Sequence, residues 1–168
     1  SFYIYDKLVD PDHSVLRYEI SPAGRVKEYE YNALGLIENE RTYLADFYPL
    51  SDKKSFDLND IDAWKKALQQ KGRMINTALT HYDYDQQGCV IRIQQFADVD
   101  EQGQGIFNDK IAETTMDYDD RGRLIKKSIK CNEDHFFHTS YSYDGLNRKT
   151  KEMVGEGSAI KQATIHEY

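Results

Sequence analysis

A short phrase of aromatic and turn-forming residues recurs along this chain. It reads Tyr-Asp-Tyr-Asp-Gln-Gln-Gly at residues 82–88, Met-Asp-Tyr-Asp-Asp-Arg-Gly-Arg at 116–123, and Tyr-Ser-Tyr-Asp-Gly-Leu-Asn-Arg at 141–148. Two more degenerate copies read Tyr-Glu-Tyr-Asn-Ala-Leu-Gly at 29–35 and Tyr-Glu-Ile-Ser-Pro-Ala-Gly-Arg at 18–25. A repeated unit usually builds architecture, whereas a catalytic site is usually made once.

Each phrase predicts a strand, a tight turn and a second strand. The two tyrosines are two residues apart and therefore share one face of a strand. The Asp that follows can bond the backbone two residues on, and the Gly or Asn at the fourth turn position tolerates a positive φ. The residues to which we assign this structural role are Tyr29, Tyr31, Gly35, Tyr82, Tyr84, Asp85, Gly88, Tyr118, Asp119, Gly122, Arg123, Tyr141, Tyr143, Asp144, Asn147 and Arg148.

An insertion at about residues 50–75 has a different pattern, which predicts one α-helix near residues 60–71. Asn59 is the expected N-cap, and Gly72 is the expected left-handed residue after the helix. The apolar residues of one helical face are Ile61, Trp64, Ala67 and Leu68. We expect this helix to pack on the sheet through Trp64.

These elements predict a mainly β fold. The expected architecture is a curved antiparallel sheet of hairpins with one inserted helix, forming a single domain over residues 1–168. The chain has no initiator methionine, and both ends fall within a repeat-like phrase, so we expect it to be a segment of a longer protein. A sheet cut from its neighbours has two unpaired edges, which favour self-association.

Composition excludes several classes of partner. The net charge of −7 and the pI near 5.2 argue against nucleic acid, whose binding surfaces are rich in clustered Lys and Arg. The sequence contains no run of about 20 apolar residues that would span a membrane. The two cysteines, Cys89 and Cys131, form no metal or redox motif and leave their redox state open.

Candidate metal sites and catalytic motifs are weak. Asp98, Asp100 and Asp109 partly match a Ca²⁺ loop, but Asp109 stands where the motif has Glu. We expect residues 97–109 to form a solvated hairpin loop instead, in which replacing Gly103 has little effect. His135 and His138 are three apart, so on a strand they point to opposite faces and favour no zinc site. No nucleophile, phosphate-loop or metalloprotease motif is present, so we expect no enzymatic activity and no cofactor.

The phrases resemble the Rhs/YD-repeat family, whose signature is Tyr-x-Tyr-Asp followed after two residues by Gly-Arg and an apolar residue. Residues 116–124 match best, with Met116 in the first tyrosine position. Residues 141–148 depart only at Asn147, and residues 82–90 have Cys89 in place of the Arg. The copy at 29–37 has Asn32 for Asp and Leu36 for Arg, and the copy at 18–26 keeps only one Tyr.

The resemblance implies a repeat shell of the kind found in bacterial Rhs proteins, insecticidal toxin-complex subunits and teneurins. We therefore expect a non-catalytic structural segment of a large bacterial secreted or cell-surface protein, toxin-like or adhesin-like. Its expected partners are neighbouring YD repeats and an enclosed toxin domain. A carbohydrate-binding or receptor-binding surface that recognises cell-surface glycans remains the alternative, because exposed tyrosines beside polar groups can stack on sugars.

Overall fold

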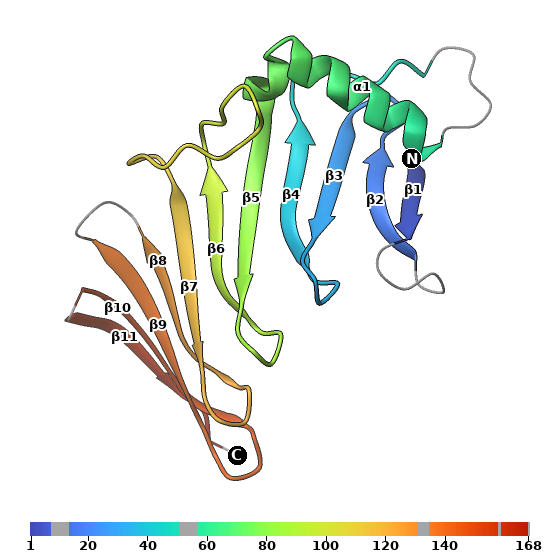
Figure 1. The fold of residues 1–168 in the computed structure, drawn as a ribbon. Coiled ribbons are helices and arrows are strands. Elements are labelled where there is room, and N and C mark those ends of the chain that lie inside the picture. The colour runs from blue at the N-terminus through green and yellow to red at the C-terminus, as the bar shows by residue number, and fades with distance from the viewer. Residues whose placement is uncertain (8–13, 51–56, 131–134, 158, 168) are drawn as a thin grey trace. The chain divides into compact units, whose positions relative to one another are not determined.

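The computed structural model describes residues 1–7, 14–50, 57–130, 135–157 and 159–167. Over these residues the chain is mainly β, with eleven strands in one antiparallel sheet and one α-helix (Figure 1). The strands follow one another in the sheet in sequence order from β1 to β11. The mainly β class and the single inserted helix predicted from the sequence are confirmed.

The elements divide between two compact units, which we describe separately. Unit 1 comprises Ser1–His81 and Gln95–Lys110, and unit 2 comprises Tyr82–Gln94 and Ile111–Tyr168. The strands are β1 (Phe2–Lys7), β2 (Ser14–Ile20), β3 (Val26–Tyr31), β4 (Ile37–Tyr43), β5 (Thr77–Tyr84), β6 (Val90–Phe96), β7 (Ala112–Tyr118), β8 (Leu124–Lys130), β9 (Phe136–Tyr143), β10 (Lys149–Glu156) and β11 (Ala159–Ile165). The helix α1 spans Leu58–Gln70, and a short 3-10 helix, η1, spans Arg73–Asn76.

One type of turn recurs six times among the described residues, and we call these the repeat turns. In each, the first residue donates its backbone N–H to the carbonyl of the residue four positions on, and the fourth donates back to the first. The side chain of the first residue accepts a further backbone N–H. The repeat turns are residues 21–24, 32–35, 85–88, 100–103, 119–122 and 144–147.

The fourth position of every repeat turn has a positive φ, from 64° at Asn147 to 92° at Gly103. A residue other than Gly, Asn or Asp loses about 1–2 kcal/mol of stability when its backbone adopts this left-handed conformation. We expect Gly122→Val, at φ 73°, to lower the melting temperature clearly. Gly145→Val is the matched control, because Gly145 has no positive φ and open space around its Cβ position. Equal melting temperatures for the two variants would contradict this explanation of the turn.

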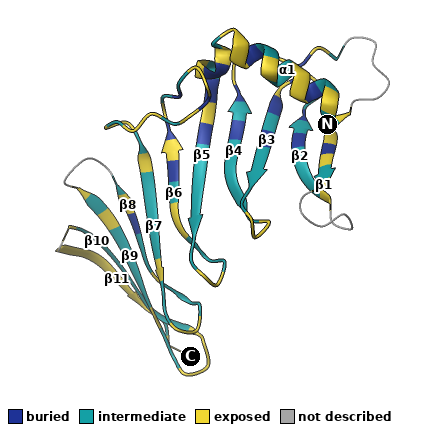
Figure 2. Cartoon of the chain, viewed as in Figure 1, coloured by how far each residue is buried: buried dark blue, intermediate teal, exposed yellow. Residues whose placement is uncertain are grey.

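The core of unit 1 lies between α1 and the strands it covers (Figure 2). Ile61 and Leu68 of the helix are buried, and Trp64 packs against Tyr43 and Tyr48 with ring centroids 4.9 and 5.7 Å apart. The buried strand residues of this core are Ile4, Tyr18, Ile20, Val26 and Tyr43. The helix therefore packs through the face that its sequence predicts.

The helix starts earlier than predicted. Its N-cap is Asp57, whose carboxylate accepts the backbone N–H of Asp60 at 2.9 Å, so the assignment of Asn59 as N-cap is wrong. Asp and Asn are equally good caps, and the pattern of apolar residues does not separate two candidates two positions apart. At the other end, Gly72 adopts the expected left-handed conformation after the C-cap Lys71.

The segment between β6 and β7 joins neighbouring strands and is largely exposed, as the sequence predicts, but part of it is packed. Val99 is buried, it forms a β-bridge with Gly105, and Phe96 packs edge-on against Phe107 with centroids 5.1 Å apart. Gly103 is buried in unit 1, with Met74 and Arg41 atoms 3.0–3.2 Å from the position of an added Cβ. The expectation that Gly103 tolerates valine is therefore wrong, because the new side chain would meet both neighbours at a φ of 92°.

Unit 2 is built from hairpins whose strands pair antiparallel from β7 to β11. Ser128 on β8 is buried and faces His138 on β9, whose Nδ1 lies 2.8 Å from the serine oxygen. Strand β11 is exposed along its whole length and has β10 as its partner (Figure 2). None of the described helices is both long and apolar enough to cross a membrane.

Candidate functional site

The residues assigned to the repeat role meet at the repeat turns of unit 2. Arg123 follows the turn at 119–122, and its Nε and Nη2 each lie 2.7 Å from Oδ2 of Asp119. The same guanidinium reaches the next turn, where Nη1 donates to Oδ1 of Asn147 at 2.9 Å and to the carbonyl of Asp144 at 3.3 Å. It also lies over the ring of Tyr143, 4.8 Å from the centroid. Arg123 thus joins two successive hairpins.

The second tyrosine of the phrase also connects neighbouring strands. The hydroxyl of Tyr118 donates to the carbonyl of Val90 at 2.9 Å, and that of Tyr143 donates to Leu124 at 2.8 Å. In unit 1 the hydroxyl of Tyr31 donates to the carbonyl of Leu16 at 2.7 Å. In all three cases the acceptor lies in the strand that precedes the tyrosine's own strand, so each hydroxyl ties a hairpin to the one before it.

Other repeat residues have related environments. Arg148 bonds Oδ2 of Asp144 through its Nε at 2.7 Å, and the ammonium group of Lys149 lies 5.5 Å from the ring centroid of Tyr141. Hydrogen bonds from Arg123 hold the pKa of Asp119 below its ordinary value, and those from the backbone and side chain of Arg148 do the same for Asp144. Three further repeat tyrosines, Tyr29, Tyr82 and Tyr84, are half-buried. The three glycines assigned to the repeat role, Gly35, Gly88 and Gly122, each occupy the fourth position of a repeat turn with a positive φ.

The calcium candidates serve local structure. Asp100 caps the repeat turn at 100–103, accepting the backbone N–H groups of Gln102 and Gln104. Oδ2 of Asp98 accepts from Asn108 at 2.8 Å and from Lys110 at 3.2 Å. Asp109 is exposed. Across the described part of the chain, no three His, Cys, Asp or Glu side chains are grouped to hold a metal ion. Cys131 lies outside the described residues, and Cys89 is a free, half-buried thiol.

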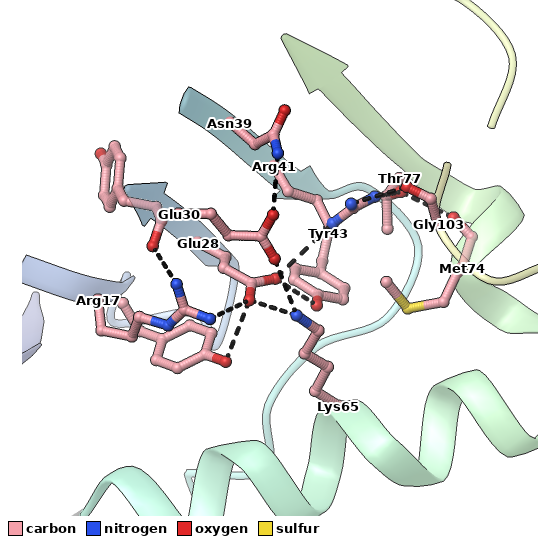
Figure 3. Close-up of polar contacts among 12 residues, drawn as sticks. Arg17, Glu28, Glu30, Asn39, Arg41, Tyr43, Lys65, Met74, Thr77 and Gly103 are labelled. Atoms are coloured by element: carbon pink, nitrogen blue, oxygen red, sulfur yellow. Dashed lines mark hydrogen bonds and ion pairs between the residues drawn. The ribbon is translucent and has the colours of Figure 1, made fainter. Parts of the chain in front are cut away.

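A buried polar cluster lies between α1 and the sheet in unit 1, and we call it the Glu28 cluster (Figure 3). Glu28 of β3 has a fully buried side chain. Its carboxylate accepts the Nζ of Lys65 from the helix at 2.5 Å, and the hydroxyls of Tyr18 and Tyr43 at 3.2 and 3.0 Å. The remaining members are Arg17, whose Nη2 lies 3.5 Å from the carboxylate, and Arg41, whose Nε lies 3.7 Å from it.

Arg41 connects the cluster to a distant part of the chain. Its Nη2 donates to the carbonyl of Gly103 at 2.7 Å and its Nη1 to Oγ1 of Thr77 at 3.1 Å. The hydroxyl of Thr77 in turn donates to the carbonyl of Met74 in η1 (Figure 3). One buried guanidinium therefore holds the repeat turn at 100–103 against β4 and the residues that follow α1.

The helix contributes two further polar contacts to this region. Lys65 also bonds Glu30 at 3.3 Å, and Asp62 accepts the hydroxyl of Tyr18 at 2.7 Å. Burial raises the pKa values of Tyr18 and Tyr43 far above the ordinary value, and the neighbouring Glu28 carboxylate adds to this effect. Both phenols therefore stay protonated. Tyr43 donates to Glu28, and Tyr18 shares its single proton between Asp62 and Glu28. The arrangement is a clamp between helix and sheet in which opposite charges are closely matched.

The Glu28 cluster has a predictable pH dependence through Glu30. Burial alone would raise the pKa of Glu30, but Lys65 and the amide of Asn39 outweigh it, so the pKa lies below its ordinary value of 4.5. Such a carboxylate stabilises the fold fully above pH 4.5, and this stabilisation is lost as the pH falls through the lower folded value. We expect Glu30→Gln to flatten the acid limb of the stability curve measured by urea unfolding between pH 3 and 6. An unchanged acid limb would contradict this assignment.

The sequence does place charged residues at inward-facing positions of both β3 and α1, and these are the signal for the cluster. Glu28 and Glu30 alternate with tyrosines, so they share a strand face with the buried Val26. Lys65 lies on the apolar helix face, four residues after Ile61 and three before Leu68. Charged residues at inward positions of both elements indicate a buried ion pair, and sequence reasoning missed them because such positions also suit solvated edges.

Comparison with known proteins adds a distant structural similarity. No family model matches the sequence, and no curated protein matches it. Among solved structures, the chain is similar to a component of a mutant Tc holotoxin pore from Photorhabdus luminescens, with 14% sequence identity and a TM-score of 0.35. The similarity covers 98% of this chain and 9% of that chain, so this chain spans a small part of the protein it matches.

Proposed function

We propose that this chain is a non-catalytic structural segment of a hairpin-repeat sheet. Its setting is a large secreted or cell-surface bacterial protein of the toxin or adhesin type, to which the YD-type phrases point. The observation that carries the proposal is the set of bonds between successive hairpins. Arg123 joins two turns, and the hydroxyls of Tyr31, Tyr118 and Tyr143 each bond the preceding strand.

The repeat residues are used for connection. The carboxylate of Asp119 bonds Arg123, and the guanidinium of Arg123 also bonds the neighbouring turn. Repetition of such bonds suits a sheet that is extended by adding hairpins, because in a repeat protein each repeat contacts only the adjacent repeats. The partners proposed for this segment are accordingly the adjoining repeats, with an enclosed toxin domain on one face.

Hydrogen exchange tests the scaffold role. In the order of strands, β1 and β11 end the sheet, and β11 is exposed throughout. We expect the amide protons of β11 that point away from β10 to exchange rapidly in the 168-residue chain and to become protected in the full-length protein, where a further strand pairs with this edge. Rapid exchange of β11 in both proteins would contradict a continuous sheet.

A glycan-binding surface is the second candidate, because β1 presents two exposed aromatic side chains. Tyr3 and Tyr5 are 54% and 58% exposed and are two residues apart, with Glu19 paired opposite Tyr3. Aromatic faces beside carboxylates can stack on sugar rings and bond their hydroxyls. We expect a glycan array probed with the chain to separate the two roles. Hits that disappear in Tyr3→Ala and Tyr5→Ala would favour glycan binding, and the absence of hits would favour the scaffold.

A further inference from the structure

Two pairs of successive repeat turns in unit 2 differ in how they are joined. The turns at 85–88, 119–122 and 144–147 follow β5, β7 and β9. These are alternate strands of the antiparallel sheet and run in the same direction, so the three turns lie at the same end of their strands (Figure 1). Arg123 joins the second and third of them. The residue at the same position after the first turn is Cys89, whose side chain is too short to reach the next turn.

A groove of about 460 Å³ lies beside the first two of these turns, and we call it the turn groove. Its lining includes Asp85, Tyr118 and Asp119. These three correspond, one repeat earlier, to Asp119, Tyr143 and Asp144, which supply the carboxylate, the ring and the carbonyl that surround the guanidinium of Arg123. The turn groove therefore repeats a guanidinium site that the chain itself fills one hairpin later.

The acceptor atoms of the turn groove are available. Oδ1 of Asp85 accepts the backbone N–H groups of Gln87 and Cys89, both at 2.9 Å. Within the described residues its Oδ2 has no partner, and this is the atom that pairs with arginine in Asp119 and Asp144. The position that corresponds to Asn147 in the preceding turn is Gly122, which has no side-chain acceptor. The side-chain oxygen of Gln87 lies 3.9 Å from the Cβ position of Gly122 and supplies an acceptor nearby.

We propose that the turn groove binds the arginine side chain of a partner polypeptide. A guanidinium suits the site better than an ammonium group, because its planar fork can pair with the carboxylate while its face stacks on Tyr118. The net charge of −7 further favours a cationic partner. The groove would thus give this stretch of sheet a docking point that its neighbour, closed by Arg123, does not offer.

Titration with a small arginine analogue tests the site directly. We expect N-acetyl-L-argininamide to shift the NMR signals of the Tyr118 ring and the Cys89 amide saturably, with a dissociation constant in the millimolar range. N-acetyl-L-lysinamide, which has the same charge, should shift them much less. Absence of saturation, or an equal response to both compounds, would overturn the proposal.

Three variants locate the binding. Asp85→Asn removes the charge but keeps Oδ1, as Asn32 does in its own turn, and should weaken binding about tenfold. Cys89→Arg supplies the guanidinium from within the chain, so it should abolish binding and raise the melting temperature by about 2–4 °C. Asp120→Asn is the control, because Asp120 lines the groove without matching a partner of Arg123. Unchanged binding by Asp85→Asn, or equal losses in Asp85→Asn and Asp120→Asn, would contradict the assignment.

Discussion

Replacing Glu28 with alanine is expected to lower the free energy of unfolding by about 3–5 kcal/mol. The carboxylate is fully buried and is shared by Lys65 at 2.5 Å and by two tyrosine hydroxyls. Its removal leaves the ammonium group and the guanidinium of Arg41 without their common counter-charge in a site that water reaches poorly. Urea unfolding measures the loss.

The fluorescence of Trp64, the single tryptophan, provides a local measurement for the same variant. Its ring packs on Tyr43, so loosening of the helix should shift its emission to longer wavelength. Glu40→Ala is the control, because Glu40 pairs with Lys27 at 2.8 Å on a partly exposed surface and should lose no more than about 1 kcal/mol. Similar losses for the two variants would show that the Glu28 cluster does not hold the helix.

Gly24→Ala is expected to be the most damaging change at a repeat turn. An added Cβ would lie 2.5 Å from the backbone oxygen of Tyr48, at a φ of 82°. Left-handed strain costs about 1–2 kcal/mol, and displacing a backbone segment adds about 1–3 kcal/mol. The displaced segment also carries the bond from the N–H of Tyr48 to the carbonyl of Gly24 and the contact of Tyr48 with Trp64.

Gly35→Ala isolates the strain from the clash. Gly35 occupies the same position in its repeat turn, at a φ of 74°, and has no atom within 4 Å of the added Cβ. We expect this variant to lower the free energy of unfolding only by the cost of the left-handed conformation, about 1–2 kcal/mol. Thermal unfolding of both variants gives the difference, and equal losses would mean that the contact with Tyr48 contributes nothing.

The sequence predicts the hairpins well because their signals are local. Asp119 and Gly122 are three residues apart, and this spacing is sufficient to form a turn through backbone bonds and one side-chain cap. The helix is predicted equally well, because its apolar residues fall on one helical face. The turn at 100–103 escaped prediction although it has the same Asp-x-x-Gly spacing, because no pair of tyrosines precedes it and its acidic residues suggest a metal loop.

The Glu28 cluster could not be predicted from local pattern alone, because its members come from four separate elements and one of them, Arg41, also bonds the loop after β6. Arg41 meets Gly103 across 62 positions of sequence, and Lys65 meets Glu28 across 37. A glutamate on a strand is usually solvated, and only its neighbours in space show that this one is not. The turn groove was missed for a related reason, since the absence of an arginine at Cys89 has meaning only when the next turn is seen beside it.

The tyrosine hydroxyls give the sheet a direction. Each bonds a carbonyl in the strand made just before its own, from Tyr31 to β2 and from Tyr143 to β8. The acceptor is therefore already synthesised when the donor leaves the ribosome, and neighbouring strands in the sheet are neighbours in sequence. Such a chain can add finished hairpins in the order of translation, without holding long unpaired stretches open until the end of synthesis.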